Sequence, residues 1–500
     1  MVNMSANLDA ILPAIVIMVT GFLVLIGDSC VSAWRSNGKG LNSGVSLVGI
    51  LIALFFTATR LNQPVHNAFS GAIIDDSFGR CAILLLLIAA ALAVLLSTTY
   101  LENKQLQHGE YYVLILFSLF GAMLMVSSND LITLFVSIET LSVALYVLAG
   151  FAKTEERSEE AALKYFLLGA FAAGFLLYGI ALVYGGTGIL TGNGGTTNLA
   201  LIATSLRDLS SVAPPLMFIL GVALVLVGLA FKSALVPFHM WTPDVYQGAP
   251  TSVTAYMAAV VKIAAFAVLF RFFNALTSIS QYWLIAVQVL AVLTMFVGNI
   301  LALTQDNVKR LLAYSSIAHA GYLTVALSAI AGKGAQLAVE ALTFYLFAYT
   351  LMTMGAFGVL IWLSHKGRDC QTLSDLKGLV KVDPAAAYMM LIFMLSLGGI
   401  PPTMGFMGKW LIFNAIMQSG QIWLAILLGF ASIISVYYYL KVVWMMCFSE
   451  PDKQTITGHA IEGWAVQLAM AVSVIGSLLF GLVPGFIQNM LGAAVNIIVR

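Results

Sequence analysis

The sequence predicts an all-α, polytopic membrane protein with about fourteen transmembrane helices, arranged as two inverted repeats that each contain a discontinuous helix. Three observations predict this fold class. Of the 500 residues, 61% are hydrophobic and only 9% are charged, whereas soluble proteins carry about 25% charged residues. Long stretches without any charge recur along the chain, and two apolar segments are interrupted by proline and glycine. Because polar surface could not cover so much apolar area in water, we expect a lipid bilayer as the solvent.

Charge and cysteine content exclude several classes of function. Lys and Arg number 23 against 22 Asp and Glu, so the net charge is +1, which argues against a nucleic-acid partner. The four cysteines, Cys30, Cys81, Cys370 and Cys447, stand far apart and form no CxxC pair. No plausible disulfide, iron–sulfur or haem set follows, and no glycine-rich nucleotide motif is present. The chain is therefore expected to bind no cofactor itself.

The charges themselves mark the gaps between the spans. A helix needs about 20 apolar residues to cross the hydrocarbon core. Nothing is ionised at neutral pH between Asp9 and Asp28 or between Arg80 and Glu102, for example. The segments 212–250 and 386–419 are not simple spans, so the count could differ by one. The expected helices cover 8–27, 43–60, 80–100, 111–127, 130–152, 162–186, 212–238, 250–271, 282–303, 310–331, 337–364, 386–419, 422–447 and 464–488.

Positive charge orients the bundle, because cytoplasmic loops are enriched in Lys and Arg. Twelve basic residues fall on one side and six on the other, which places the first side inside and both termini on the periplasmic side. The inner set is Arg35, Lys39, Lys104, Lys153, Arg157, Lys309, Arg310, Lys366, Arg368, Lys377, Lys381 and Lys453. The outer set is Arg60, Arg80, Arg207, Arg271, Lys333 and Arg500.

Several ionisable residues fall inside the predicted spans, where a charge at the bilayer centre costs about 2.5–3.5 kcal/mol. Glu139, Lys232, Lys262 and Lys409 lie well within their segments. A single buried charge could serve only as a structural hydrogen-bonding group, but four at similar depth on four helices favour a function. A free lysine has a pKa of about 10.4, which burial lowers and a nearby carboxylate raises. A lysine that makes and breaks contact with Glu139 would therefore bind and release a proton.

Other polar residues in apolar segments have less certain roles. Lys164 either extends to the inner interface or takes part in the function, and Lys441 is expected to extend to the interface. His239 and His319 are candidates for a proton relay because histidine titrates near neutral pH, although each could equally be a structural donor.

Interrupted segments surround two of the lysines. Three prolines follow Lys232 in FKSALVPFHMWTPDVYQGAP, and glycines and prolines precede Lys409 in SLGGIPPTMGFMG. The two interruptions are about 170 residues apart, as expected for corresponding positions of two related halves. Within a single membrane domain, 1–500, the expected parts are N-terminal helices at 1–105, a first repeat at 106–275, a second at 276–450, and a C-terminal helix at 451–500.

The motifs around these residues are similar to a known family. SIETLSVALYVLAGF with Glu139, EAALKYFLLGA with Lys164, GLAFKSALVPFHMWTPDVYQGAPT with Lys232, and NVKRLLAYSSIAHAGY with His319 resemble the antiporter-like membrane subunits of respiratory complex I. These subunits are related to Mrp-type cation/proton antiporters, and the resemblance covers roughly residues 100–450. The chain is expected to end soon after its fourteenth span, without the lateral helix of L-type subunits. M-type subunits resemble one another in having glutamate at the position of Lys409. The lysine in this sequence therefore indicates the N-type subunit.

The resemblance implies a proton-pumping subunit of NADH–quinone oxidoreductase in the bacterial inner membrane. Glu139 and Lys232 would form the interacting pair, Lys262 the middle relay, and Lys409 the residue that passes the proton outward. Lys164, His239 and His319 would assist. Electron transfer with NADH, FMN, iron–sulfur clusters and quinone would take place in other subunits, and other membrane subunits would be the partners.

Three alternative functions remain at this point. The chain could belong to an Mrp-like antiporter or a membrane-bound hydrogenase, with sodium as the alternative ion. It could be an independent solute transporter, although no arginine lies at the centre of a span. It could also be a scaffold without a pumping role.

Overall fold

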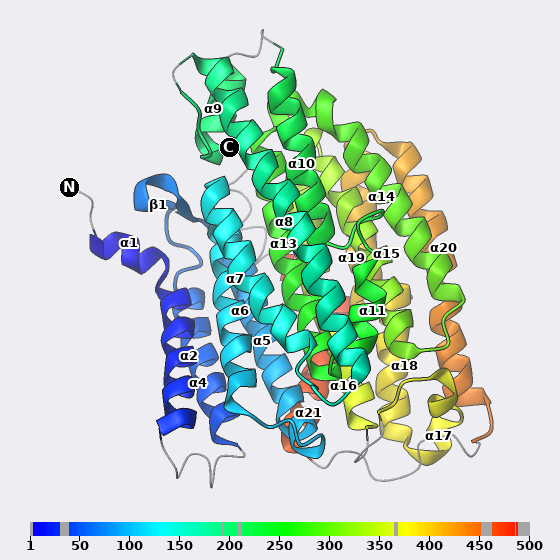
Figure 1. Ribbon diagram of the computed structural model, residues 1–500. Helices are drawn as coiled ribbons and strands as arrows, with labels where there is room; N and C mark the ends of the chain where they lie inside the picture. Colours follow the sequence, from blue (N-terminus) through cyan, green and yellow to red (C-terminus); the bar gives the residue numbers. More distant parts are fainter. Residues whose placement is uncertain are drawn as a thin grey trace.

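The protein is a bundle of long α-helices that stand side by side (Figure 1). The computed structural model describes residues 4–30, 40–192, 194–208, 213–364, 369–451, 463–485 and 487–488. Within these residues, twelve helical segments are long and apolar enough to cross a membrane. They are α2 (Leu12–Cys30), α4 (Leu41–Thr59), α5 (Ser77–Asn103), α6 (Gly109–Ser127), α7 (Leu131–Ala149), α8 (Glu156–Thr191), α12 (Thr251–Tyr256) continued by η2 (Met257–Val261) and α13 (Lys262–Ala275), η3 (Thr277–Ile279) with α14 (Ser280–Leu303), α15 (Val308–Ser328) with η4 (Ala329–Ala331), α16 (Ala335–Trp362), α20 (Ile422–Phe448) and α21 (Trp464–Leu482).

The two remaining predicted spans are the two that contain interruptions. In the first, α10 (Leu216–Lys232) ends well before α11 (Trp241–Gly248). In the second, α18 (Pro384–Gly398) is followed by α19 (Met404–Gln418). The all-α membrane fold is thus confirmed, and both segments predicted to be discontinuous are divided. The count of about fourteen crossings and the inverted relation of the two halves stay predictions.

Local sequence explains why the second of these helices stops. The helix α18 begins at Pro384, with the Asp383 side chain accepting from the amide of Ala386. It ends where Gly399 adopts a left-handed conformation, with φ +79°, which glycine adopts without steric cost. The next residues include Pro401, which has no amide hydrogen to donate. The α18 helix therefore leaves carbonyl groups at its end that other donors must satisfy.

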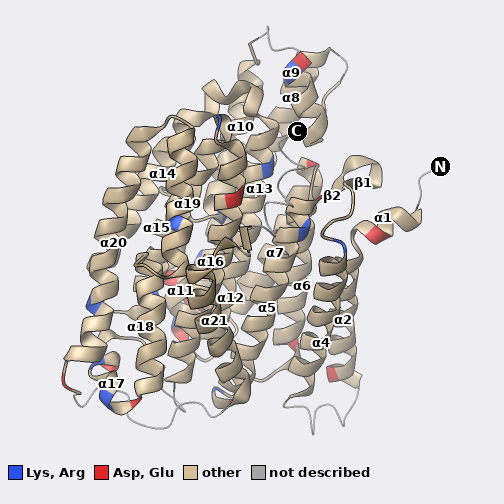
Figure 2. Ribbon diagram, turned by 180° about the vertical axis from the view of Figure 1, so that it is seen from behind, with Lys and Arg blue, Asp and Glu red and all other residues tan. Residues whose placement is uncertain are grey.

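Short elements cover the two ends of the bundle. The strands β1 (His66–Ala68) and β2 (Ile73–Asp75) form an antiparallel hairpin on the same end as α9 (Leu199–Asp208), and α17 (Leu379–Val382) lies at the opposite end (Figure 1). Charged residues gather at these two ends, and few lie in the middle of the bundle (Figure 2). The other short elements are α1 (Met4–Ala10), η1 (Phe69–Gly71) and η5 (Leu373–Leu376).

The helices differ in how deeply they are buried. The segments α5, α12–α13, α15 and α16 are enclosed by protein, whereas α2, α4, α8, α14 and α20 expose much of their surface. The exposed side chains are apolar, for example Phe171 and Ile285, each 71% exposed, and Ile433, 70% exposed. This pattern suits lipid or neighbouring membrane helices on the outside. Charged side chains on the enclosed helices can therefore avoid lipid.

Several basic residues expected in loops instead form ion pairs at the end of the bundle that carries the hairpin. Arg60 and Arg80 both bind Asp75, at 2.9 and 2.7 Å, and Arg80 is only 3% exposed. The guanidinium group of Arg271 binds both carboxylate oxygens of Asp76, at 2.8 and 2.6 Å. The loop placement of Arg80 and Arg271 was wrong, because Arg80 lies in α5 and Arg271 in α13. Arg35, Lys39, Lys366, Arg368, Lys453 and Arg500 lie outside the described residues.

Candidate functional site

Three of the predicted lysines lie inside the bundle, on three different helices. Lys232, Lys262 and Lys409 are 4%, 4% and 8% exposed, and His319 is 1% exposed. Their burial was predicted from the sequence. Because a charge removed from water is costly unless other groups stabilise it, the contacts of each side chain show what the protein can do with it.

Lys232 is the last residue of α10, where the first broken helix stops. Its ammonium group donates to the hydroxyl of Ser142 on α7 at 2.8 Å and to the hydroxyl of Tyr165 on α8 at 3.3 Å. The Tyr165 ring stacks on Trp241 of α11, with the centroids 4.5 Å apart. The negative end of the helix dipole also favours a cation at this position. Both halves of the broken segment therefore contribute to the surroundings of Lys232.

Glu139 lies on α7, one helical turn before Ser142. It is half-buried, and its charge attracts that of Lys232. The carboxylate and the ammonium are not within the 4.0 Å of a direct ion pair, because Lys232 contacts the Ser142 hydroxyl instead. A proton exchange between Glu139 and Lys232 therefore stays a prediction, and it requires a side-chain movement or an intervening hydroxyl or water.

Lys262 is the first residue of α13 and directly follows the π-helical turn η2. Such turns are frequent at functional sites. The ammonium group donates to the Ser316 hydroxyl of α15 at 2.8 Å and also to the Ser316 carbonyl. It lies 4.6 Å from the centroid of the Tyr349 ring of α16, a distance typical of a cation–π contact. Lys262 is thus bound by neutral groups from two other enclosed helices.

His319 lies one turn beyond Ser316 on α15. Its Nδ1 is 2.7 Å from the Tyr345 hydroxyl of α16, and its Nε2 is 3.0 Å from the Tyr439 hydroxyl of α20. In a neutral imidazole one ring nitrogen donates and the other accepts. The ring can therefore join the Tyr345 and Tyr439 hydroxyls in one chain of hydrogen bonds. The charges of Lys262 and Lys409 both act on this ring. His319 therefore joins tyrosines of α16 and α20, and its ring lies within electrostatic reach of both the middle lysine and the last one.

Lys409 of α19 is bound at the end of the second broken helix. Its ammonium group donates to the carbonyl of Gly398, the last residue of α18, at 2.9 Å. It also reaches the Ser435 hydroxyl at 3.4 Å and lies 5.0 Å from the centroid of the Tyr322 ring. Lys232 and Lys409 are thus each placed at the C-terminal end of the first part of a broken helix, although Lys409 comes from the helix that follows.

The two other candidates lie outside this row. Lys164 is 40% exposed and forms ion pairs with Glu160 at 2.6 Å and Asp244 at 2.7 Å. It ties α8 to α11, and Asp244 is also bound by Arg310 at 2.6 Å. His239 is half-buried in the link between α10 and α11 and makes no hydrogen bond to the three buried lysines among the described residues. Their supporting roles in proton transfer stay predictions.

Sequence reasoning missed the hydroxyl groups that contact the lysines and His319. They come from serines and from tyrosines that are fully enclosed. The sequence holds 18 tyrosines, and nothing in their spacing separates the enclosed ones from those facing outward, such as the 61% exposed Tyr178. The hydroxyl-bearing residues in contact with the row are Ser142, Tyr165, Ser316, Tyr345, Tyr439 and Ser435.

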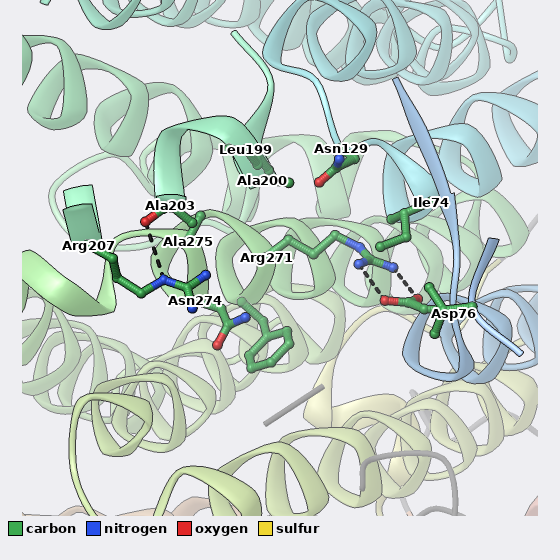
Figure 3. Close-up of a pocket in the computed structure, with 12 residues that line it drawn as sticks. Ile74, Asp76, Asn129, Leu199, Ala200, Ala203, Arg207, Arg271, Asn274 and Ala275 are labelled. Carbon is green, nitrogen blue, oxygen red and sulfur yellow. Dashed lines mark hydrogen bonds and ion pairs between the residues drawn. The ribbon is translucent and has the colours of Figure 1, made fainter. Parts of the chain in front are cut away.

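A separate cavity of about 260 Å³ opens beside the Arg271–Asp76 ion pair, between α9, α13 and β2. Figure 3 shows the guanidinium group of Arg271 facing Asp76, while Arg207 bonds on the far side to the carbonyl of Ala203. The cavity lies at one end of the bundle, and none of the three buried lysines lines it. Among the described residues, no group of His, Cys, Asp or Glu side chains is arranged to hold a metal ion.

Comparison with known proteins identifies the family. Residues 128–435 match the model of the NADH:quinone oxidoreductase/Mrp antiporter transmembrane family. The chain is 43% identical, over 98% of both chains, to NADH-quinone oxidoreductase subunit N of Trichlorobacter lovleyi. It belongs to the subunit N family. A second relative, subunit N 1 of Herpetosiphon aurantiacus, is 42% identical over 96% of this chain and 95% of its own.

Solved structures agree with this membership of the subunit N family. A chain of respiratory complex I from Thermus thermophilus with bound aureothin is 34% identical, with a TM-score of 0.77 over 95% of this chain and 98% of its own. A chain of the Mrp complex from Dietzia has a TM-score of 0.82 over 99% of this chain and 98% of its own. At 21% identity, that second likeness establishes a shared fold only.

Proposed function

We propose that this chain, as the N-type membrane subunit of NADH-quinone oxidoreductase, carries protons along the row formed by Glu139, Lys232, Lys262, His319 and Lys409. The observation that carries the proposal is the set of partners of the three lysines. Each ammonium group is bound by hydroxyl, carbonyl or aromatic groups, and none has a carboxylate within ion-pair distance among the described residues. A buried lysine without a fixed counter-charge is not held in its charged form, so it can release its proton.

The contacts suggest an order of transfer. Lys232 would take up a proton while the charged Glu139 carboxylate attracts its ammonium form. It would then pass that proton along the bundle to Lys262. From Lys262 the path would continue through the Ser316 hydroxyl, which binds Lys262, and the His319 ring, which binds Tyr345 and Tyr439, and water would complete it to Lys409. Each step needs a hydrogen-bonded path, because a proton moves only between groups within hydrogen-bond reach or joined by water. Lys409 would deliver the proton to the outer side.

The chain supplies the membrane part of an enzyme whose redox chemistry takes place elsewhere. NADH oxidation and quinone reduction, with FMN and iron–sulfur clusters, would belong to other subunits, and this chain would bind none of these groups. The first antiporter-like repeat would be residues 106–275 and the second 276–450. Both termini would lie on the periplasmic side of a bacterial inner membrane.

Glu139 also indicates where a partner subunit lies. It stands on a face of α7 flanked by Val136, 58% exposed, and Val143, 55% exposed. A carboxylate facing lipid would be costly, whereas a neighbouring membrane subunit can cover it and provide polar contacts. We therefore place the adjacent membrane subunit of the complex against this face of α7.

The test is to replace Lys232 or Glu139 by alanine in the complete complex. Assembly is checked on native gels, and NADH-driven proton pumping is measured after reconstitution into vesicles. Both variants are expected to assemble and to lose pumping. Lys441→Ala is the matched control, because Lys441 lies at the rim of the bundle and binds the exposed Asp306 at 3.4 Å. Unchanged pumping in assembled Lys232→Ala and Glu139→Ala complexes would refute the relay and leave the scaffold alternative.

A further inference from the structure

One more buried lysine lies near the predicted inner end of the bundle, outside the row described above. Lys309 is the second residue of α15 and is only 2% exposed. Its ammonium group donates to the carbonyl of Ala249 at 2.6 Å. Ala249 directly follows α11, so this bond holds α15 against the junction between α11 and α12. The sequence pattern had placed Lys309 in a loop, where it would have no special role.

Charged groups from three other segments surround Lys309. Asp369 and Glu155 attract it and Lys104 repels it. Asp369 is bound by Lys104 at 3.0 Å, and among the described residues no carboxylate lies within 4.0 Å of the Lys309 ammonium. One of its three donors is satisfied by Ala249, which leaves two for other partners. Lys309 therefore resembles the lysines of the row, since its bound partner is neutral.

A small cavity adjoins this group. It offers about 20 Å³ for the centre of a water molecule and is lined by Lys309, Lys104, Asp369 and Glu155, among others. A cavity of roughly 10–15 Å³ by this measure is enough for one water, provided that polar partners are present. Because Glu155 is 50% exposed while Lys309 is buried, the cavity lies between the inner surface and the interior.

The α15 helix connects this cavity with the row. Lys309 and Ser316 are seven residues apart, so they share one face of the helix at a separation of about 10 Å along its axis. Ser316 is the residue that accepts from Lys262. The Tyr246 side chain of α11 lies close to Ser316 on the same side, and α11 ends at the carbonyl that binds Lys309. Polar groups thus occupy both ends of this two-turn interval.

We propose that Lys309 is a further proton-transfer residue, which takes up protons from the inner face and passes them along α15 toward Lys262. A water in the cavity would pass a proton to the neutral Lys309 amine as it receives another from the aqueous side, and the resulting ammonium would release its proton to a water or hydroxyl on the path to Ser316. No electron and no other reactant takes part. This inference rests on the proposed function of the row. It adds a second entry for protons, which leads directly to Lys262 and does not pass through Lys232.

Four substitutions separate this role from that of a structural anchor. Arginine and glutamine can both donate to the Ala249 carbonyl but do not exchange a proton near neutral pH. Histidine can donate and titrate, and methionine can do neither. If Lys309 transfers protons, assembled complexes with Lys309→Arg, Lys309→Gln and Lys309→Met lose pumping, and Lys309→His retains part of it. If Lys309 only anchors Ala249, Lys309→Arg and Lys309→Gln pump as the parent does, which would overturn the proposal.

Two controls make the result specific. Lys381→Gln changes an exposed lysine that binds Glu450 at 2.6 Å, and it is expected to leave pumping unchanged. Lys262→Met, measured in the same vesicles, tests the row itself. Normal pumping with Lys262→Met would refute the proposed function, whereas loss with Lys262→Met together with normal pumping in Lys309→Gln would refute only the role of Lys309.

Discussion

Replacement of Gly399 by alanine should displace Lys409 without removing its amine. Gly399 has φ +79° and caps α18, a conformation that costs an L-residue about 1–2 kcal/mol. A methyl group built on Gly399 would lie 2.8 Å from Cδ and 3.1 Å from Nζ of Lys409. An ordinary contact between carbons needs about 3.5–4.0 Å, so the lysine stem would have to move by about 1 Å.

That movement is enough to break the bond between Lys409 and the Gly398 carbonyl, which is 2.9 Å long. A hydrogen bond to a charged group contributes about 1.5–3 kcal/mol. The Gly399→Ala complex should therefore assemble but pump protons more slowly, because Lys409 retains its amine and loses its fixed position. Proton pumping per assembled complex is the measurement, with assembly read from native gels.

Gly429→Ala is the matched control, because Gly429 lies in α20 with nothing near a new methyl group. Alanine is favoured over glycine inside a helix by about 1 kcal/mol, so pumping and stability should be preserved. If Gly399→Ala pumps as well as the parent and Gly429→Ala, the position of Lys409 at the end of α18 does not matter for transfer.

Three further predictions use the same vesicles. Lys409→Glu should keep part of the pumping and Lys409→Ala should lose more, because a protonated carboxyl group can still donate to the Gly398 carbonyl. His319→Phe leaves the Tyr345 hydroxyl without this partner at about 1–3 kcal/mol, while the Tyr439 hydroxyl keeps its bond to Ser315, so the change should lower both pumping and thermal stability. His319→Gln should restore stability but not pumping. Asp76→Ala leaves Arg271, which is 10% exposed, without its counter-charge, so thermal unfolding of the purified complex should show a loss of stability smaller than the roughly 3–5 kcal/mol of a fully buried pair.

Each of these predictions has a result that contradicts it. Equal losses for Lys409→Glu and Lys409→Ala would show that a titratable group at this position is not sufficient. Full pumping in His319→Gln would mean that the imidazole acts only as a structural link. An Asp76→Ala complex that unfolds at the parent temperature would show that the ion pair at the hairpin end contributes little to stability.

The membrane fold and the buried lysines were predictable because both follow from composition. Burying a charge among apolar residues is costly, so Lys262 within TAYMAAVVKIAAFAVLF stands out in the sequence. The two interruptions were predictable for the same reason, since proline and glycine break a regular apolar segment. Their boundaries were less certain, and the expected helix at 212–238 in fact ends at Lys232.

The contacts between helices were not predictable from one sequence. The bond from Lys232 to Ser142 is one such contact, and the interaction expected between Glu139 and Lys232 stays a prediction. A serine inside an apolar helix usually bonds to its own backbone, so nothing marked Ser142 as a partner. Lys309 was misplaced because it stands beside Arg310 in a charged stretch, and only the packing of α15 shows that one of the two is buried.

A density map of the parent membrane complex that resolves ordered water would test the relay most directly. Continuous water and hydroxyl groups should join Glu139, Lys232, Lys262 and Lys409, with neighbouring oxygen and nitrogen atoms within hydrogen-bond distance of one another. If the lysines instead lie in separate dry pockets in every state of the complex, protons do not follow this row, and only the membrane fold of the chain is supported.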